Sequence, residues 1–190
     1  MLYTGKGDDG TTRLFASKNG QAKTFGCDQR ISKSSAIAEA LGSVDEVNAL
    51  LGVVKLSGGN TTAIAELAWH DLLADVQHDL FIVQAELAGA AKQMDSTRVE
   101  KLSSWVNAIE KELPPITTFF VSGGTELAAL CDHARTVARR AERRVVDALE
   151  KEKEHKKELF AYMNRLSSLL YALARLANHQ AGIPEEQPHY

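Results

Sequence analysis

The 190-residue chain has only two cysteines, no net positive charge and no long apolar run. Cys27 and Cys131 form no CxxC pair and are too few for a disulfide framework, so we expect two reduced thiols. The formal net charge of −3 gives no general reason to expect nucleic-acid binding. No apolar run approaches the roughly 20 residues that a membrane span requires, and "MLYTGKGDDG" lacks the apolar core of a secretory signal. We therefore expect a cytoplasmic protein that binds neither nucleic acid nor membrane.

The sequence also lacks the common metal-binding and catalytic patterns. Its six histidines form no ligand spacing, and its one Glu-x-x-His, Glu152 to His155, lies in a charged run. A di-iron bundle would need two such motifs facing a core. No Ser-His-Asp or Cys-His arrangement can be argued, and the Walker A pattern GxxxxGK[ST] is absent. We therefore expect no metal held by protein ligands and no nucleophilic side chain.

Helical periodicity is the main feature that is present. Apolar residues recur at helical spacing in five segments, at about 34–58, 61–91, 97–112, 125–152 and 157–181. No strand alternation of any length appears, so the predicted fold class is all-α, a five-helix bundle with a Gly-rich N-terminal loop. That loop can include short strands and is expected to order on binding. We expect one domain over residues 1–190, divided into the loop (1–33), the bundle (34–181) and a frayed tail (182–190).

The stretch "GKGDDGTTR", residues 5–13, contains three glycines and no hydrophobic residue. Glycine permits backbone conformations that point several N–H groups at one anion. Thr11 and Thr12 can add hydroxyl donors, and Lys6 and Arg13 can add positive charge. The stretch favours a polyphosphate site, although a Gly-rich loop alone does not distinguish such a site from a plain surface loop.

Arginines cluster in "HARTVARRAERRVV", residues 133–146. At about 100° per residue, four charged residues fall on one side of the predicted helix, beside its small core-facing residues; they are Arg135, Arg139, Glu142 and Arg143. Arg140 and Arg144 are expected to point to solvent. One interpretation is a solvated basic face with ion pairs such as Arg139–Glu142. The other is an anion clamp, because guanidinium groups match phosphate oxygens and stay charged when partly buried.

A second polar strip lies in "YMNRLSSLLYALAR", residues 162–175, where Asn164 and Ser168 share one helix face. Asparagine inside a helix costs some helix propensity. Asn164 is therefore either a surface amide or an amide that hydrogen-bonds a ligand, and the stretch alone leaves both interpretations open.

Three segments together resemble the ATP:cob(I)alamin adenosyltransferases of the propanediol-utilisation type. They are "YTGKGDDGTTRLF" with "RISKSS", then "FFVSGGTELAALCDHARTVARRAERRVV", then "YMNRLSSLLYALAR". The stretch "EALGSVDEVNALLG" also resembles the first helix of that family, and the order and spacing match across nearly the whole chain. The resemblance implies a helical bundle that assembles as a homotrimer, with active sites between subunits.

The activity that the resemblance implies is transfer of the 5′-deoxyadenosyl group from ATP to the cobalt of cob(I)alamin, with release of triphosphate. ATP would arrive with Mg²⁺, and a flavoprotein or another reductase would reduce Co(II). By position in the family motifs, the residues expected to contact ATP are Thr4, Gly5, Lys6, Gly7, Thr12, Arg13, Lys33, Arg139, Arg140, Ala141, Glu142, Arg143 and Asn164.

The resemblance also implies three further roles. Arg135, Arg139 and Phe119 are the expected catalytic residues. Phe119 matches the aromatic residue that packs under the corrin ring and excludes its lower ligand, and Ser168 is expected on the same corrinoid side. Asp45 is expected to pair with Arg135 across a subunit boundary.

The chain departs from the family pattern at three places. Ser122 stands where the family often has proline before the glycine pair, and "TGKG" is a variant of the commoner loop start. Ser168 stands where the family usually has aspartate in "NRLSD", which puts the contribution of a carboxylate near the corrinoid in doubt.

Two other functions fit the same residues. One is a non-catalytic ATP or corrinoid sensor built on the same bundle. The other is a helical interaction protein whose arginines bind an acidic partner. Adenosyl transfer would separate the first from an enzyme, and Mg²⁺-dependent ATP binding would argue against the second.

Overall fold

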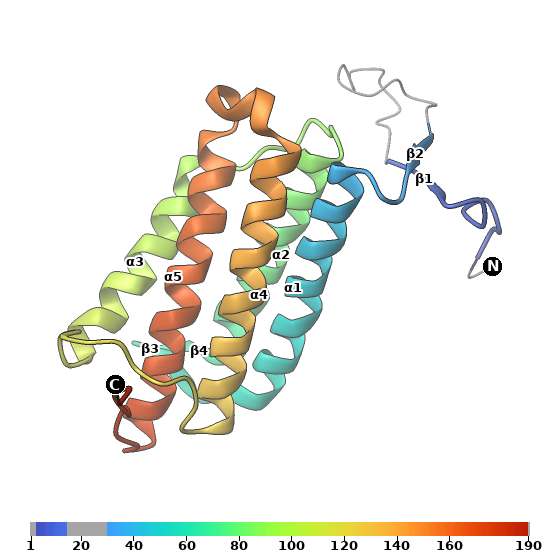
Figure 1. Ribbon diagram of the computed structural model, residues 1–190. Coiled ribbons are helices and arrows are strands. Elements are labelled where there is room, and N and C mark those ends of the chain that lie inside the picture. The colour runs from blue at the N-terminus through green and yellow to red at the C-terminus, as the bar shows by residue number, and fades with distance from the viewer. Residues whose placement is uncertain (1–2, 15–29, 190) are drawn as a thin grey trace.

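The computed structural model describes residues 3–14 and 30–189 (Figure 1). Within them the chain forms five α-helices that run side by side: α1 (Ala36–Gly58), α2 (Trp69–Leu87), α3 (Ser96–Glu112), α4 (Glu126–Ala148) and α5 (Lys157–Gln180). Helix α4 packs against both α1 and α5, while α1 also packs against α2, and α3 against α5. The predicted helical fold class is therefore confirmed. None of the helices in this part of the chain is long and apolar enough to cross a membrane.

Side-chain caps explain where three of the helices begin. Ser35, Asp95 and Thr125 directly precede α1, α3 and α4, and each side chain accepts a hydrogen bond from a backbone N–H three residues further on. Such caps satisfy N–H groups that have no partner inside the helix. The predicted starts of these three helices are correct to within about two residues for this reason.

The second predicted helix, at 61–91, is wrong at both ends. Its first part forms an antiparallel hairpin of β3 (Thr62–Ile64) and β4 (Leu67–Ala68), and α2 begins only at Trp69 and ends at Leu87. Ala65 in the turn has a positive φ of 49°, which no α-helix contains. A short apolar run is compatible with either a strand or a helix by periodicity, and here the run pins Ala63 and Ile64 in the core.

Two other predicted boundaries also change. The fourth helix was expected to reach residue 152, but α4 ends at Ala148 and a 3₁₀ helix, η1 (Glu150–His155), follows. The tail at 182–190 was expected to be frayed, but the backbone N–H of Val121 donates to the carbonyl of Glu186 at 2.8 Å. The C-terminal segment is therefore held in place as far as Glu186.

The N-terminal region contains the short strands that the sequence allowed. Strands β1 (Thr11–Arg13) and β2 (Arg30–Ser32) pair antiparallel, with Thr12 opposite Ile31. Figure 1 shows this pair standing beside the N-terminal end of α1, on the opposite side of the molecule from α3. Cys27 lies outside the described residues.

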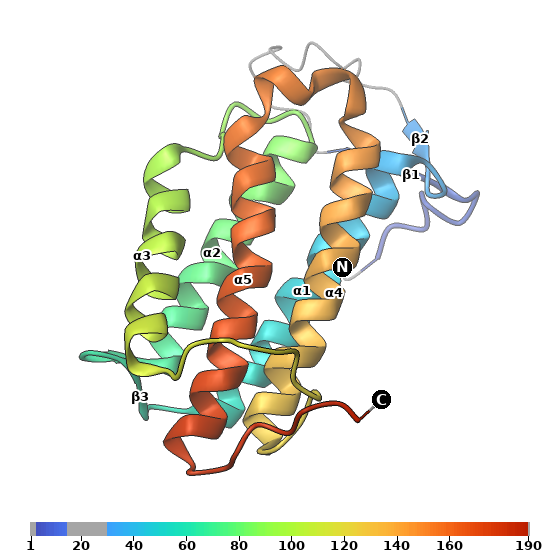
Figure 2. The ribbon, with the colours of Figure 1, turned by 60° about the vertical axis from the view of Figure 1, so that its left-hand side comes forward.

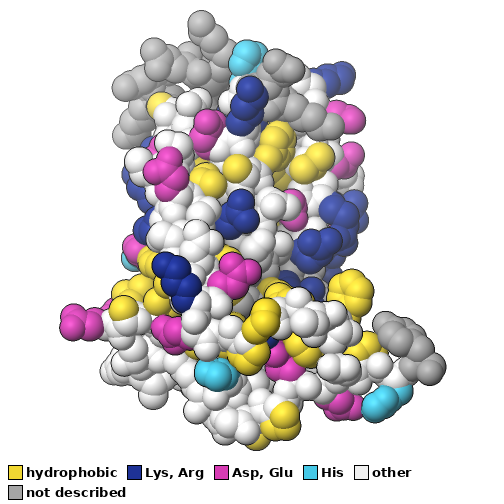
Figure 3. Space-filling model, turned by 90° about the vertical axis from the view of Figure 1, so that its left-hand side faces the viewer, with side chains coloured by type: hydrophobic (Ala, Val, Ile, Leu, Met, Phe, Trp, Pro, Cys, Tyr) yellow, Lys and Arg dark blue, Asp and Glu magenta, His cyan; other side chains and the backbone are white. Residues whose placement is uncertain are grey.

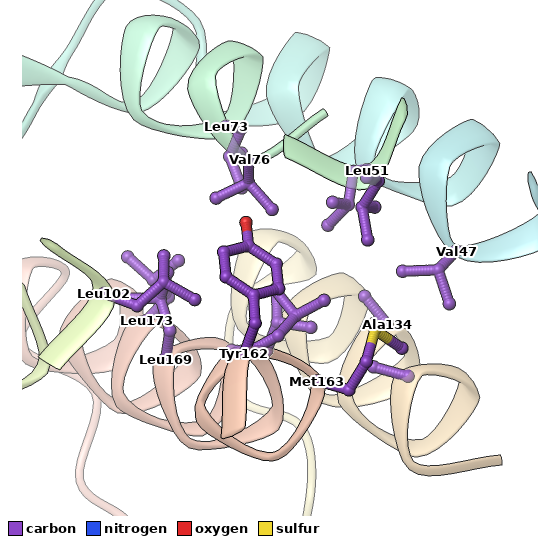
Figure 4. Close-up of a cluster of buried hydrophobic side chains, with 14 of the residues drawn as sticks. Val47, Leu51, Leu73, Val76, Leu102, Ala134, Tyr162, Met163, Leu169 and Leu173 are labelled. Atoms are coloured by element: carbon purple, nitrogen blue, oxygen red, sulfur yellow. The ribbon is translucent and has the colours of Figure 1, made fainter. Parts of the chain in front are cut away.

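A buried polar cluster ties three helices together inside the core. Tyr162 rises from α5 toward Leu73 and Val76 of α2 (Figure 4). Its hydroxyl donates to the carboxylate of Asp79 at 3.2 Å, and that carboxylate, which is 1% exposed, also pairs with Arg98 and Lys101 of α3. Burial, and then the charge of Asp79, raise the pKa of Tyr162 well above its usual value. The phenol therefore stays neutral and fixes the registry of α2, α3 and α5.

Two glycines of α1 offer a matched test of the packing. A Cβ at Gly58 would lie 2.7 Å from Cβ of the buried Trp69, whereas no heavy atom lies within 4 Å of a Cβ at Gly42. We expect Gly58→Ala to lower the free energy of unfolding by about 1–3 kcal/mol through overpacking. We expect Gly42→Ala to raise it by about 0.5–1 kcal/mol through helix propensity. Urea unfolding of both variants measures the difference, and equal values would contradict the packing of α1 on Trp69.

Candidate functional site

Small residues set the position of α4. Its core face carries four alanines with no exposed area, and they are Ala128, Ala134, Ala138 and Ala141. Alanine projects only a methyl group, so α1 and α5 can both approach the α4 backbone closely. The long arginine side chains of α4 then emerge along the two edges of the helix. This arrangement confirms the predicted placement of small residues beside the arginines.

The arginines on the α1 edge are neutralised. Arg140 pairs with Glu46, and Arg144 pairs with Glu39 at 3.4 Å; both glutamates belong to α1. Both side chains are about half exposed, so the prediction that these two arginines point to solvent is confirmed. Their ion pairs were not predicted, because the carboxylates that attract them lie about a hundred residues earlier in the sequence.

Arg139 and Arg143 differ from those two residues. Both are exposed, and neither forms an ion pair with any carboxylate in residues 3–14 or 30–189. The predicted Arg139–Glu142 pair is not present, because Glu142 instead accepts a hydrogen bond from the Asn164 amide at 3.1 Å. Two cationic groups thus remain available to an anion, with Glu142 and Asn164 forming a bridge from α4 to α5 beside them.

One hollow, of about 630 Å³, brings four of the predicted site residues together. It is lined by residues 116–120 of the segment between α3 and α4, by two arginines of α4 and by three residues of α5; the predicted members are Phe119, Arg135, Arg139 and Ser168. Phe119 is 79% exposed, which is unusual for a phenylalanine. On the face drawn in Figure 3, the largest group of basic side chains lies along the right-hand edge, with hydrophobic side chains below it.

Arg135 occupies the inner wall of this hollow. Its Nε donates to Oδ1 of Asp132 at 3.0 Å, and its guanidinium lies 5.7 Å from the centre of the Tyr171 ring. Asp45, its predicted partner, instead accepts a hydrogen bond from the Gln84 amide at 3.3 Å. A single chain therefore does not form the Asp45–Arg135 pair, and the pair across a subunit boundary stays a prediction.

A second hollow, of about 750 Å³, lies beside the N-terminal segment. Thr12, Arg13 and Lys33 line it, together with the first part of α1 and the last part of α2, including the exposed Phe81. The two hollows share no lining residue. In one chain the glycine-rich segment and the arginine edge of α4 therefore face different spaces.

Consecutive turns shape the glycine-rich segment. The N–H of Asp8 donates to the Gly5 carbonyl, and the N–H of Gly10 donates to the Gly7 carbonyl, both at 3.2 Å. Gly5 and Gly10 adopt positive φ angles of 68° and 78°, which glycine adopts without strain. Lys33 is held against these turns, since its Nζ donates to the Gly7 carbonyl at 2.8 Å and its N–H donates to the Gly10 carbonyl at 2.9 Å.

Thr4 and Lys6 complete the predicted set in this segment. The N–H of Lys6 lies 3.4 Å from the Thr4 hydroxyl oxygen, and both residues are exposed. The segment therefore exposes the side chains of Thr4 and Lys6 to an anion, whereas the N–H groups of its turns already donate within the segment.

Arg30 is a residue of this region to which sequence reasoning gave no role. Its guanidinium donates to the carbonyl and the hydroxyl of Thr11 and to the carbonyl of Lys6, so it joins β2 to the glycine-rich segment. The Thr11 hydroxyl in turn donates to Asp9 at 2.7 Å, and that hydrogen bond lowers the pKa of the Asp9 carboxyl. In the register of β1 and β2, Arg30 lies opposite Arg13, so no local sequence pattern indicates its contacts with Thr11 and Lys6.

Both hollows combine largely apolar walls with a few cationic side chains, Arg135 and Arg139 in the first and Arg13, Lys33 and Lys92 in the second. Among the described residues, no three His, Cys, Asp or Glu side chains gather in a way that could hold a metal ion. Cys131 is buried and free, and burial raises the pKa of its thiol to about 12, so it carries no thiolate at neutral pH. The two hollows can therefore bind an anionic ligand and can present an aromatic side chain to a flat ligand.

Comparison with known proteins identifies relatives of the whole chain. A family model described as cobalamin adenosyltransferase matches residues 2–177. The corrinoid adenosyltransferase PduO of Citrobacter freundii is 36% identical over 187 residues, which are 95% of this chain and 50% of that protein. The chain thus spans about half the length of that relative. The corrinoid adenosyltransferase of Bacillus subtilis is 35% identical over 193 residues, which are 96% of this chain and 89% of that protein.

Solved structures share the fold. A variant of the PduO-type ATP:corrinoid adenosyltransferase from Lactobacillus reuteri, complexed with cobalamin and ATP, aligns with a TM-score of 0.83 at 26% identity, over 100% of this chain and 97% of that one. Another variant of the same enzyme, complexed with ATP, aligns with a TM-score of 0.81 at 26% identity, over 99% and 100% of the two chains.

Proposed function

The chain belongs to the cobalamin adenosyltransferase family, and from that membership we propose that it transfers the 5′-deoxyadenosyl group of ATP to the cobalt of cob(I)alamin. The products are adenosylcobalamin and triphosphate. The observation that carries the proposal is the hollow where the exposed Phe119 lies with Arg139, a cation without a carboxylate partner in the described chain. The relatives named corrinoid adenosyltransferases, and the related structure complexed with cobalamin and ATP, support the same reaction.

The reaction explains why no nucleophilic side chain is needed. The Co(I) of the corrinoid substrate is itself the nucleophile. It supplies the electron pair that bonds to C5′ of the ribose, and the bond from C5′ to the triphosphate oxygen breaks. The protein has two tasks, which are to hold C5′ in line with cobalt and to stabilise the charge that builds on the departing triphosphate.

Arginine and lysine suit the second task. Arg139 and Arg143 keep their guanidinium groups free of carboxylates in the described structure, and guanidinium forks match phosphate oxygens. Lys33 is held next to the turns of the glycine-rich segment. Mg²⁺ would arrive with ATP, held by phosphate oxygens and water, which fits its preference for few protein ligands.

A homotrimer would complete the ATP site. The glycine-rich segment and the arginine edge of α4 line separate hollows, so one chain does not surround a triphosphate with both. We infer that residues 4–7, 12, 13 and 33 of one subunit meet residues 139–143 and 164 of the next around one ATP. The Asp45–Arg135 pair would lie at the same boundary, replacing the contact of Asp45 with Gln84.

The hollow with Phe119 suits the corrinoid. An exposed aromatic ring at its mouth can pack under the corrin and exclude the lower ligand of cobalt. Four-coordinate Co(II) is easier to reduce, so a flavoprotein or another reductase could deliver the electron. Ser168 faces this hollow where the family pattern has aspartate, so any contact there is neutral in this chain.

The direct test is to incubate the protein with ATP, Mg²⁺ and chemically generated cob(I)alamin. The proposal predicts the absorption change to adenosylcobalamin together with release of triphosphate in equal amount. Binding of both substrates without product would instead identify a sensor on the same bundle.

Arg139→Ala should lower turnover by about 10²-fold or more, the effect of losing one preorganised donor to developing charge. The matched control is Arg144→Ala, because Arg144 is already paired with Glu39 on the other edge of α4. Turnover is measured with saturating ATP and pre-reduced corrinoid. Near-normal turnover of the Arg139 variant would count against the clamp.

Phe119→Ala should impair the reaction that starts from Co(II) far more than the reaction that starts from Co(I), because the ring acts on the lower ligand before reduction. Val121→Ala is the control, since Val121 is an exposed residue of the same loop that does not line the hollow with Phe119. Both rates are followed by the corrinoid absorption. Equal losses from the two starting states would remove the role assigned to Phe119.

Asp45→Asn should weaken assembly or ATP binding, because it removes the charge that is expected to hold Arg135 of a neighbouring subunit. Sedimentation gives the oligomeric state, and equilibrium binding gives the ATP affinity. If neither quantity changes, the pair across the boundary does not exist.

A further inference from the structure

The loop that carries Phe119, residues 113–125, has no regular secondary structure. It crosses the lower part of α5, and the C-terminal segment runs close beside it (Figures 1 and 2). A side chain that must meet a substrate needs a fixed backbone, and a loop without its own ladder of hydrogen bonds must be fixed by its neighbours. The residues that hold this loop are therefore functional candidates.

Two side chains of α5 form hydrogen bonds with the backbone of the loop near its two ends. Nη2 of Arg175 donates to the Pro114 carbonyl at 3.0 Å, next to the end of α3. At the other end, the Asn178 amide donates to the Gly123 carbonyl at 2.8 Å and accepts from the N–H of Thr125 at 2.9 Å. A Cβ at Gly124 would overlap the Asn178 amide, so the close approach requires glycine there.

Arg175 depends on the C-terminal segment. Its side chain is 5% exposed, and its Nε and Nη2 donate to the two carboxylate oxygens of Glu185 at 2.6 and 2.8 Å. A buried guanidinium needs a charged partner, and the two-pronged pair also fixes its plane. The Cζ atom of the guanidinium lies 5.2 Å from the centre of the Phe120 ring, one residue from Phe119. The hydrogen bonds that Arg175 donates to Glu185 raise the pKa of Arg175 above its usual value.

The same segment also contacts the middle of the loop. The N–H of Val121 donates to the Glu186 carbonyl at 2.8 Å, two residues after Phe119. The loop is thus held at Pro114, Phe120, Val121 and Gly123. Arg175, which Glu185 holds, makes the first two contacts, and Glu186 makes the third.

We propose that Arg175 and Glu185 are positioning residues, and that residues 182–189 form a strap that fixes the loop bearing Phe119. The effect of the strap on the cobalt chemistry rests on the function proposed above. The contacts by which the strap fixes the loop do not depend on that function. Neither residue touches the hollow where Phe119 lies, so both act through the loop. Loosening the strap should misplace the aromatic ring without altering the arginine edge of α4.

Glu185→Ala is the direct test, with Glu186→Ala as its matched control. Glu186 is the adjacent residue of the same type, and its side chain is exposed and has no ion pair in the described chain. The alanine variant keeps the backbone hydrogen bond between Val121 and residue 186. Glu185→Gln removes the charge but keeps an acceptor, so its effect should be intermediate. Hydrogen exchange and activity are measured on the assembled protein in all three variants.

Hydrogen exchange tests the strap without reference to activity. In Glu185→Ala, the amides of peptides spanning residues 114–125 should exchange about tenfold faster, because one charge-assisted pair is lost. Peptides of α1, α2 and the middle of α4 should keep their wild-type exchange rates. Glu186→Ala should match the wild type throughout. An unchanged exchange rate at 114–125 in Glu185→Ala would overturn the strap, as would an equal acceleration over the whole chain.

Activity tests the consequence for the reaction. Glu185→Ala should lower the Co(II)-started rate about tenfold while the Co(I)-started rate and the ATP affinity stay within about twofold of wild type. Equal losses from both starting states would overturn the positioning role. If the wild type itself makes no adenosylcobalamin from Co(I), the proposed function fails, and the exchange result alone then decides whether the strap exists.

Discussion

The close packing of α4 between α1 and α5 is the constraint on which the other features depend. Alanines at the contact allow both neighbours to approach the α4 backbone, and this leaves the arginines no place except the two edges of the helix. The α1 edge is neutralised by Glu46 and Glu39, and the α5 edge keeps Arg139 without a carboxylate among the described residues. One helix thus has both an edge of ion pairs and an edge of arginines without carboxylate partners in the described residues. A larger residue at any of these alanines would separate the helices and alter both edges together.

The side chains that line the two hollows come partly from helices and partly from segments without regular secondary structure. The arginines lie on a long helix whose position is set by the core, whereas Phe119 and the glycine-rich segment lie outside the helices. Each irregular segment has its own anchoring cation, Arg30 for the N-terminal turns and Arg175 for the loop before α4. Both cations donate to backbone carbonyls far away in the sequence. Arginine can do this because its five donors reach several acceptors at once while its charge is balanced by one carboxylate.

Most of the helical fold could be predicted from the sequence, because caps and apolar periodicity are local signals. α1, α3 and α5 lie where the periodicity placed them. The hairpin at 62–68 could not be separated from a helix, since a run of a few apolar residues fits both. The partners of Arg140 and the docking of the tail by Glu185 depend on contacts that no local pattern contains.

The site was predictable only in part, and for a related reason. Resemblance to a family located Phe119, Arg139 and Ser168, and the structure brings them to one hollow. It did not indicate Arg30, Arg175 or Asn178, because these residues act on backbone atoms whose position depends on the tertiary fold. Residues that touch a ligand leave a motif in the sequence, while residues that place them often leave none.

We propose that cationic and polar groups distant in sequence converge on one triphosphate while the corrinoid supplies the nucleophile. A crystal structure of the protein with ATP and Mg²⁺ tests it most directly. It should show residues 4–13 and 139–143 contacting the phosphates of the same ATP, contributed by adjacent subunits. A complex in which these two segments lie far apart, both within and between subunits, would contradict it.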